Sequence, residues 1–173
     1  AVWVGAASGP IAIGGGRNCI GGQTATTDGL PIDMRQFRGF VAFAAAARTM
    51  TVHSGTRWRE VQDSIDKYGL AVKIMQTYNS LTVGGALSVN AHGRYIGQGP
   101  VVRSVRSITL VLADGRVVTA SRDENPELFF GAIGGYGAIG GIADVTLHLA
   151  GTSRRRPRDE KLPGRTYASS FRK

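Results

Sequence analysis

Glycine-rich stretches hold the residues of this sequence that are best suited to bind a ligand. The first is residues 11–23 (IAIGGGRNCIGGQ), where an apolar run breaks into three glycines, an Arg-Asn-Cys step and two more glycines. Glycine reaches backbone angles that other residues avoid, and it lets a ligand approach the main chain closely. A loop of this kind can direct successive backbone N–H groups at an anion such as a diphosphate.

Two further stretches repeat the pattern. Residues 81–94 (LTVGGALSVNAHGR) place Gly84-Gly85 before a helix-compatible run, so their backbone N–H groups are also expected to converge on an anion. The third stretch, residues 134–147, reads GGYGAIGGIADVTL. The first two stretches are thus each suited to present backbone N–H groups to an anion.

The common nucleotide-binding motifs do not explain these glycines. No Lys-Ser/Thr pair follows the first loop, as a P-loop requires, and Cys19 stands where the third glycine of the dinucleotide fingerprint belongs. Residues 135–140 match G-x-G-x-x-G, and Asp159 follows about twenty residues later. This run, however, follows a predicted helix and opens a predicted strand, which is the reverse of the required order.

The N-terminal half contains the elements that must position the first two stretches. Strand ends are expected at residues 2–4 and 11–13, and a strand at 30–34. Residues 40–47 are rich in alanine, which suits a helix, but we favour a hairpin that turns near Arg48-Thr49 and returns through 50–54.

A helix is predicted over residues 56–68, with Thr56 as N-cap and Gly69 ending it. Its apolar positions Trp58, Val61 and Ile65 share one face. A short buried run (70–75) and a polar loop (76–80) lead into the second stretch.

The C-terminal half alternates between strand and helix signals. Asp114-Gly115 between 105–112 and 116–120 is a strong hairpin signal. Asn125 and Pro126 predict a helix start, and residues 142–149 alternate as a half-buried strand does.

The net charge of +9 is concentrated at the C-terminus. Residues 151–173 hold eight of the 21 basic residues and two of the 12 acidic ones, and so contribute +6. This tail lacks an apolar period and is expected to be disordered, whereas residues 1–150 form the patterned domain. No nucleic-acid motif accompanies the charge, so no specific nucleic-acid partner is expected.

Other classes are disfavoured by what the sequence lacks. The single cysteine excludes an internal disulfide framework, and no metal-ligand cluster is evident. No signal or membrane-spanning run is seen, so a cytoplasmic location is expected.

The three glycine-rich stretches and their spacing closely resemble the PCMH-type FAD-binding domain of the vanillyl-alcohol oxidase superfamily. Sugar-acid and alditol oxidases and the decaprenylphosphoryl-ribose oxidase group are the most similar members. The resemblance covers residues 8–149 and implies an α+β fold of two α/β subdomains. It also implies that the C-terminal substrate domain is missing from this chain.

The resemblance implies that the first loop and Thr82–Gly85 hold the FAD diphosphate, with residues 89–92 near the ribityl chain and ring system and Ile142 near the adenine. The implied cofactor-binding positions are Ile13, Gly14, Gly15, Gly16, Arg17, Asn18, Cys19, Ile20, Gly21, Gly22, Thr77, Thr82, Val83, Gly84, Gly85, Val89, Asn90, Ala91, His92 and Ile142.

Asn18 is a departure from the family pattern, because many relatives carry at this place a histidine that tethers the flavin covalently. An amide cannot form that bond, so dissociable FAD is expected. Cys19 is an alternative tether, although a small buried cysteine is the more common role.

The resemblance implies an oxidoreductase that moves a hydride from a CH–OH group of a sugar-like, polyol or lactone substrate to flavin N5. No residue stands out as the catalytic base, and the chain alone is expected to be inactive. A truncated, non-catalytic remnant that only binds FAD, or folds poorly alone, is the alternative.

Overall fold

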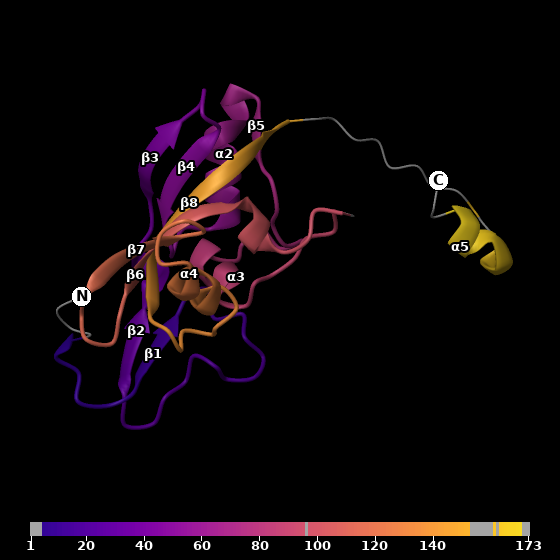
Figure 1. Ribbon diagram of the computed structural model, residues 1–173. Helices are drawn as coiled ribbons and strands as arrows, with labels where there is room; N and C mark the ends of the chain where they lie inside the picture. Colours follow the sequence, from indigo (N-terminus) through magenta and orange to yellow (C-terminus); the bar gives the residue numbers. More distant parts are fainter. Residues whose placement is uncertain (1–4, 96, 153–160, 162, 171–173) are drawn as a thin grey trace.

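The computed structural model describes residues 5–95, 97–152, 161 and 163–170. Two sheets form the body of the molecule (Figure 1). The predicted strand at residues 2–4 lies outside the described residues. In the basic tail, the described part comprises a 3₁₀ turn at Gly164–Thr166 and a helical turn, α5, at Tyr167–Ser170.

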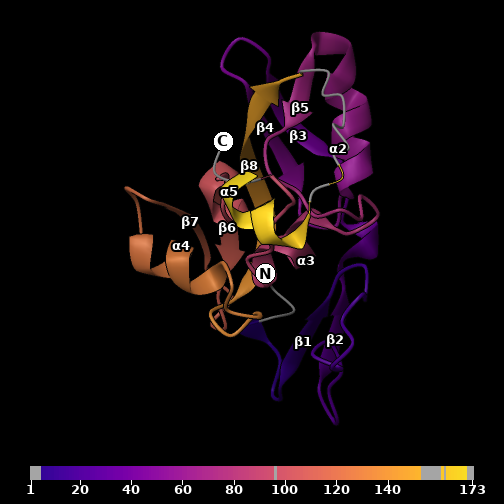
Figure 2. The ribbon, with the colours of Figure 1, turned by 90° about the vertical axis from the view of Figure 1, so that its right-hand side faces the viewer.

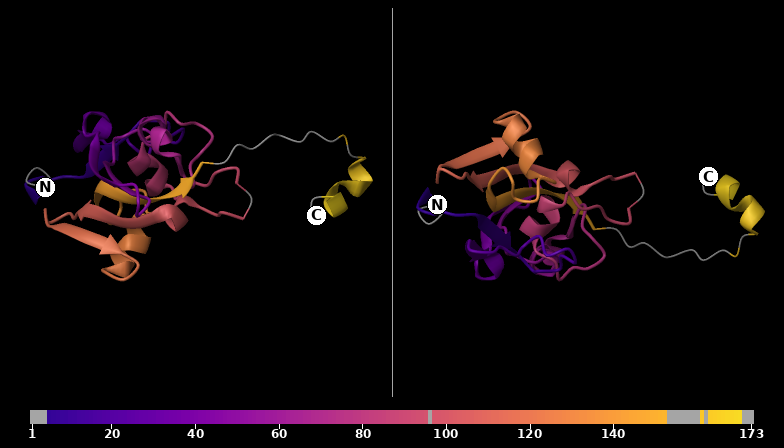
Figure 3. Two further views of the ribbon diagram at one scale, coloured as in Figure 1. Left: turned by 90° about the horizontal axis from the view of Figure 1, so that it is seen from above. Right: turned by 90° about the horizontal axis from the view of Figure 1, so that it is seen from below.

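The larger sheet is antiparallel and has the order β3-β4-β8-β6-β7, with β5 also pairing with β8. Its central strand β8 spans Gly141–Gly151 and pairs with three others. Figure 3 shows β7 and α4 on one side of β8, and the β3–β4 hairpin on the other. The remaining strands are β3 (Phe40–Ala44), β4 (Thr49–His53), β5 (Leu70–Val72), β6 (Val105–Val111) and β7 (Val117–Ser121).

Both predicted hairpins are confirmed. β3 pairs with β4, so the alanine-rich run is a strand, and the turn occupies residues 45–48, where Arg48 has a φ of 50°. The turn therefore comes slightly earlier than predicted. Asp114-Gly115 connects β6 and β7, and Gly115 has a φ of 82°, which glycine adopts without strain.

Helix α2 (Trp58–Ile65) buries its predicted face, and Gly69 ends the following 3₁₀ turn in the left-handed region. The predicted N-cap was wrong. Thr56 directs its hydroxyl to the backbone of Gly39, and helix α2 begins instead after Arg57, whose N–H donates to the Glu60 carboxylate at 2.8 Å.

The core lies between the sheet and the helices α2, α3 (Val83–Ser88) and α4 (Pro126–Ala132), which face the viewer in Figure 2. Buried side chains of β8 alternate as predicted, except that a bulge opposite Thr109/Leu110 shifts the register between Ile142 and Val145. The other sheet face is polar: a hydrogen bond of 2.6 Å joins His53 Nδ1 to Asp144 Oδ1 across β4 and β8.

The smaller sheet pairs β1 (Ile11–Gly14) in parallel with β2 (Leu30–Asp33). Both strands lie where the sequence predicts them. A 3₁₀ turn, Met34–Gln36, then leads back to the main sheet. Gly55 fixes this junction, because its N–H donates to the Phe37 carbonyl at 3.0 Å.

None of the helices in the described part of the chain has the length and apolar character that crossing a membrane requires.

Replacing Gly55 by alanine should unfold this junction. A Cβ at residue 55 would overlap the backbone carbonyl oxygens of Met34 and Phe37, which cannot rotate away. We expect G55A to lower the free energy of unfolding by about 3 kcal/mol, measured by urea denaturation. Gly151→Ala is the control: a Cβ there contacts nothing within 4 Å, so we expect a change below about 0.5 kcal/mol. Equal effects of the two variants would contradict this account.

Candidate cofactor-binding cleft

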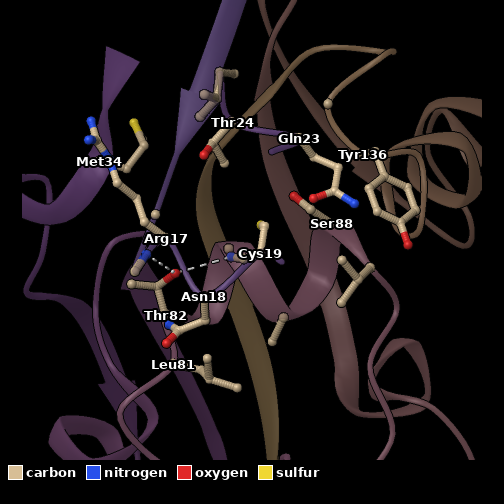
Figure 4. A pocket seen from close by; sticks show the side chains of 18 of the residues that line it. Arg17, Asn18, Cys19, Gln23, Thr24, Met34, Leu81, Thr82, Ser88 and Tyr136 are labelled. Carbon is tan, nitrogen blue, oxygen red and sulfur yellow. Dashed lines mark hydrogen bonds between the residues drawn. The ribbon is translucent and has the colours of Figure 1, made fainter. Parts of the chain in front are cut away.

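A cleft of about 400 Å³ lies where the three glycine-rich stretches meet. Its walls are the loop after β1, the helix α3, and the turn that precedes β8. Figure 4 shows Asn18 and Cys19 on one side of this cleft, and Ser88 and Tyr136 across it. A cavity of this size is typical of small-molecule sites, which range from about 300 to 1,000 Å³.

The Thr82 hydroxyl joins the first two stretches. Its Oγ1 accepts a hydrogen bond from Gly16 N at 3.4 Å and from Gly85 N at 3.3 Å (Figure 4). Thr82 is 2% exposed, and a Cβ at Gly15 would overlap the same hydroxyl. The first loop can therefore rest against α3 only because residue 15 is glycine and residue 82 caps the helix.

The glycines of the second stretch serve close packing. Val83 N donates to Thr56 O and Gly84 N to Ser54 O, both at 2.8 Å, and Gly85 N is taken by Thr82. A Cβ at Gly84 would lie 2.6 Å from Ser54 Cβ. The expectation that these amides converge on an anion is thus not met, because each already has a protein acceptor.

The first loop, by contrast, offers unused donors. The backbone N–H groups from Arg17 to Gly21 have no acceptor among the residues the structure describes. Residues 17–21 are exposed, so water can satisfy these N–H groups and a ligand can take its place. No aspartate or glutamate is among the described residues that line the cleft, so its lining does not repel an anion.

Arg17 is oriented by an acidic neighbour. Its guanidinium lies 3.7 Å from Asp33, and its own φ is 53°. Hydrogen bonds from the Arg35 side chain and backbone hold the pKa of Asp33 well below its usual range. Asp33 therefore stays ionised at neutral pH and keeps attracting Arg17.

The third stretch closes the far side of the cleft. Gly134 N donates to Leu87 O at 2.9 Å and Tyr136 N to Ser88 O at 3.0 Å, so this turn satisfies carbonyls at the end of α3. The rejection of the dinucleotide fingerprint stands, because α4 precedes this run and β8 follows it.

The predicted positions divide into two groups. Thirteen of them line the cleft: Ile13, Gly15, Gly16, Arg17, Asn18, Cys19, Ile20, Gly21, Thr82, Gly84, Gly85, Val89 and Ile142. The other seven do not line it: Gly14, Gly22, Thr77, Val83, Asn90, Ala91 and His92.

Two of these seven, Asn90 and His92, use their side chains in local hydrogen bonds. Asn90 has a φ of 42°, and its Oδ1 accepts from Val102 N at 3.3 Å, which fastens the segment after α3. His92 is exposed, and its Nδ1 lies 3.1 Å from the Gly93 carbonyl.

Sequence reasoning missed several residues of the cleft. Tyr136, Gly137 and Gly140 line it, whereas Ile142 is the only residue of the third stretch among the predicted cofactor-binding positions. Ser54 and Gln76 also line it, and each has a buried side-chain oxygen without a partner in the described structure. Nothing in the local sequence distinguishes these two, since their position follows from the packing of β4 and α3.

Comparison with known proteins agrees with this geometry. Residues 7–121 match the family model described as "FAD binding domain". The chain belongs to this family of FAD-linked oxidases. The resemblance and the α+β fold inferred from the three stretches are thereby confirmed.

Individual relatives cover most of the chain. It is 33% identical over 150 residues to cytokinin dehydrogenase 4 of Oryza sativa subsp. japonica, covering 80% of this chain and 27% of that protein. It is 31% identical over 147 residues to L-gulonolactone oxidase of Mus musculus, covering 82% of this chain and 33% of that protein. It is 34% identical over 103 residues to the rice mitochondrial L-galactono-1,4-lactone dehydrogenase 2, covering 60% and 18%. The chain thus spans a third or less of the length of these relatives.

Removing the Thr82 hydroxyl should separate the first loop from α3. Thr82→Val keeps the shape but leaves the Gly16 and Gly85 amides without an acceptor and removes the N-cap. We expect the free energy of unfolding in urea to fall by about 2 kcal/mol and the affinity for FAD to fall about tenfold. Thr82→Ser keeps the hydroxyl and should retain both. A T82V protein that matches T82S in both measurements would contradict the bridging role.

Proposed function

We propose that this chain binds FAD non-covalently in the cleft and forms the cofactor-binding part of an oxidoreductase. The observation that carries the proposal is the row of unused N–H groups from Arg17 to Gly21 in a cleft that no described carboxylate lines. A diphosphate is rich in acceptors and poor in donors, which is the complement of this surface. When bound, FAD supplies a two-electron acceptor for the reaction.

The remaining wall suits the uncharged parts of the cofactor. Ile13, Val89, Tyr136 and Ile142 give the cleft an apolar and aromatic lining beside the polar loop. Aromatic and apolar side chains take up flat rings by burial and stacking. The residues present therefore fit a dinucleotide, in which a charged diphosphate joins two ring-bearing ends.

The side chain at residue 18 in the first loop supports non-covalent binding. Asn18 lines the cleft and is exposed, and an amide is not nucleophilic enough to form a stable bond to the flavin. Cys19 also lines the cleft and carries an exposed free thiol, so it is the competing tether that an experiment must exclude.

The oxidation of a CH–OH group in a sugar-like, polyol or lactone substrate is the reaction we propose for the whole enzyme. It is supported by the names of two relatives, a gulonolactone oxidase and a galactonolactone dehydrogenase. Cytokinin dehydrogenases match equally well, so the substrate class must be decided by experiment.

FAD added to the protein should bind and then be released by acid. We expect the protein to take up one equivalent of FAD, which trichloroacetic acid leaves in the supernatant while the protein precipitates. Cys19→Ser should behave identically, because we assign no bond to the thiol. Flavin that remains in the wild-type pellet but not in the C19S pellet would establish the cysteine tether. Failure to take up FAD at all would overturn the proposed function.

Anaerobic bleaching of bound FAD tests the reaction. Polyols, aldonolactones and cytokinins are mixed in turn with the FAD-loaded protein, and the flavin absorbance is followed. We expect bleaching by a polyol or an aldonolactone in a longer protein that includes a substrate-binding part, and none with the 173-residue chain. Bleaching of the longer protein by cytokinins alone would contradict the proposed substrate class.

A further inference from the structure

Ser54 is a buried residue whose hydroxyl has no role in the fold. It is 3% exposed, and its Oγ has no hydrogen-bond partner in the described residues. Its backbone is fully used: its N–H donates to Ala143 O and its carbonyl accepts from Gly84 N, both at 2.8 Å. The residue is thus held between β8 and α3, and its side chain lines the cleft.

An unpartnered buried hydroxyl lowers the stability of a folded protein and is uncommon. Two other buried hydroxyls, by contrast, are paired: Thr56 donates to Gly39 O at 3.1 Å, and Ser104 donates to Val101 O at 2.9 Å. An alanine at residue 54 would fill nearly the same space without the cost. The hydroxyl is therefore best explained by a partner that enters the cleft.

We propose that Ser54 is a further cofactor-binding residue, whose hydroxyl donates to an oxygen of the FAD diphosphate. This inference rests on the proposed function. The position supports it, because Ser54 packs against Gly84 in the first turn of α3, beside the contact of Gly16 and Gly85 with Thr82. This is where the two glycine-rich stretches meet. A serine hydroxyl rotates among three staggered positions, so it can turn toward a ligand without moving the backbone.

The structure also indicates why a donor belongs here. The N–H groups of Gly84 and Gly85 are already hydrogen-bonded to protein acceptors, so this wall of the cleft offers few backbone donors. The hydroxyl of Ser54, which follows β4 and packs against α3, supplies an additional hydrogen-bond donor to this wall. Together with the N–H groups of the first loop, it would hold the diphosphate from two sides.

Ser54→Ala tests the proposal, with Ser104→Ala as the matched buried-serine control. We measure FAD affinity by flavin fluorescence titration, ADP affinity by competition with FAD, and stability without ligand by urea denaturation. We expect S54A to weaken FAD and ADP by a similar factor, about tenfold, while the ligand-free protein is as stable as wild type or more stable. S104A should show the opposite: lower stability and unchanged affinity, because its hydroxyl is paired away from the cleft.

Each outcome decides the question. Unchanged FAD affinity in S54A, with wild type binding FAD, would overturn the role of Ser54 and leave the proposed function standing. Weakened FAD binding with unchanged ADP affinity would overturn the assignment to the diphosphate. A wild-type protein that binds neither FAD nor ADP would remove the proposed function and this inference together. Ser54→Cys, which keeps a side chain of similar size but is a poor donor, should show the same loss if S54A does not fold.

Discussion

The Thr82 hydroxyl is the contact on which the arrangement of the cleft depends. It is the shared acceptor for an amide of the first loop and an amide of α3, and it lies where residue 15 must lack a side chain. Two segments 66 residues apart in sequence are thereby held at hydrogen-bonding distance. Thr82 itself is buried and both hydrogen bonds are partly buried, so loss of the acceptor would leave two donors without a protein partner.

The first and second glycine-rich stretches look alike in sequence but have different roles in the structure. In the second stretch, the glycines let α3 pack against Ser54 and Thr82, and their N–H groups donate to acceptors within the protein. In the first stretch, the loop leaves several N–H groups without a protein acceptor among the described residues. One side of the cleft is thus fixed by packing and hydrogen bonds within the protein, and the other side, the first loop, carries the unpaired donors. A ligand that fills the cleft would satisfy the second side and so stabilise the folded state.

Much of this fold was predictable, because local signals agreed with the tertiary structure. The β6–β7 hairpin, the buried face of α2 and the alternation of β8 follow from turn residues and apolar period. The predicted cap of α2 failed because Thr56 finds a better partner in Gly39, 17 residues away, and no local pattern contains that contact. The same limit applies to the cleft: the glycine-rich stretches can be recognised in the sequence, and Tyr136 lies within the third, whereas Ser54 and Gln76 are brought to the cleft only by folding.

The chemistry of the first loop has a consequence for how firmly a cofactor is held. Arg17 is drawn toward Asp33, so the full positive charge of its side chain is shared with a carboxylate and is not reserved for the ligand. The diphosphate would then be bound largely by neutral N–H and O–H donors, each of which adds little alone. Their combined effect depends on pre-organisation, which the third stretch provides by fastening Leu87 and Ser88 of α3 through Gly134 and Tyr136. Under the proposed non-covalent binding, FAD would be retained only as long as these three segments keep their positions.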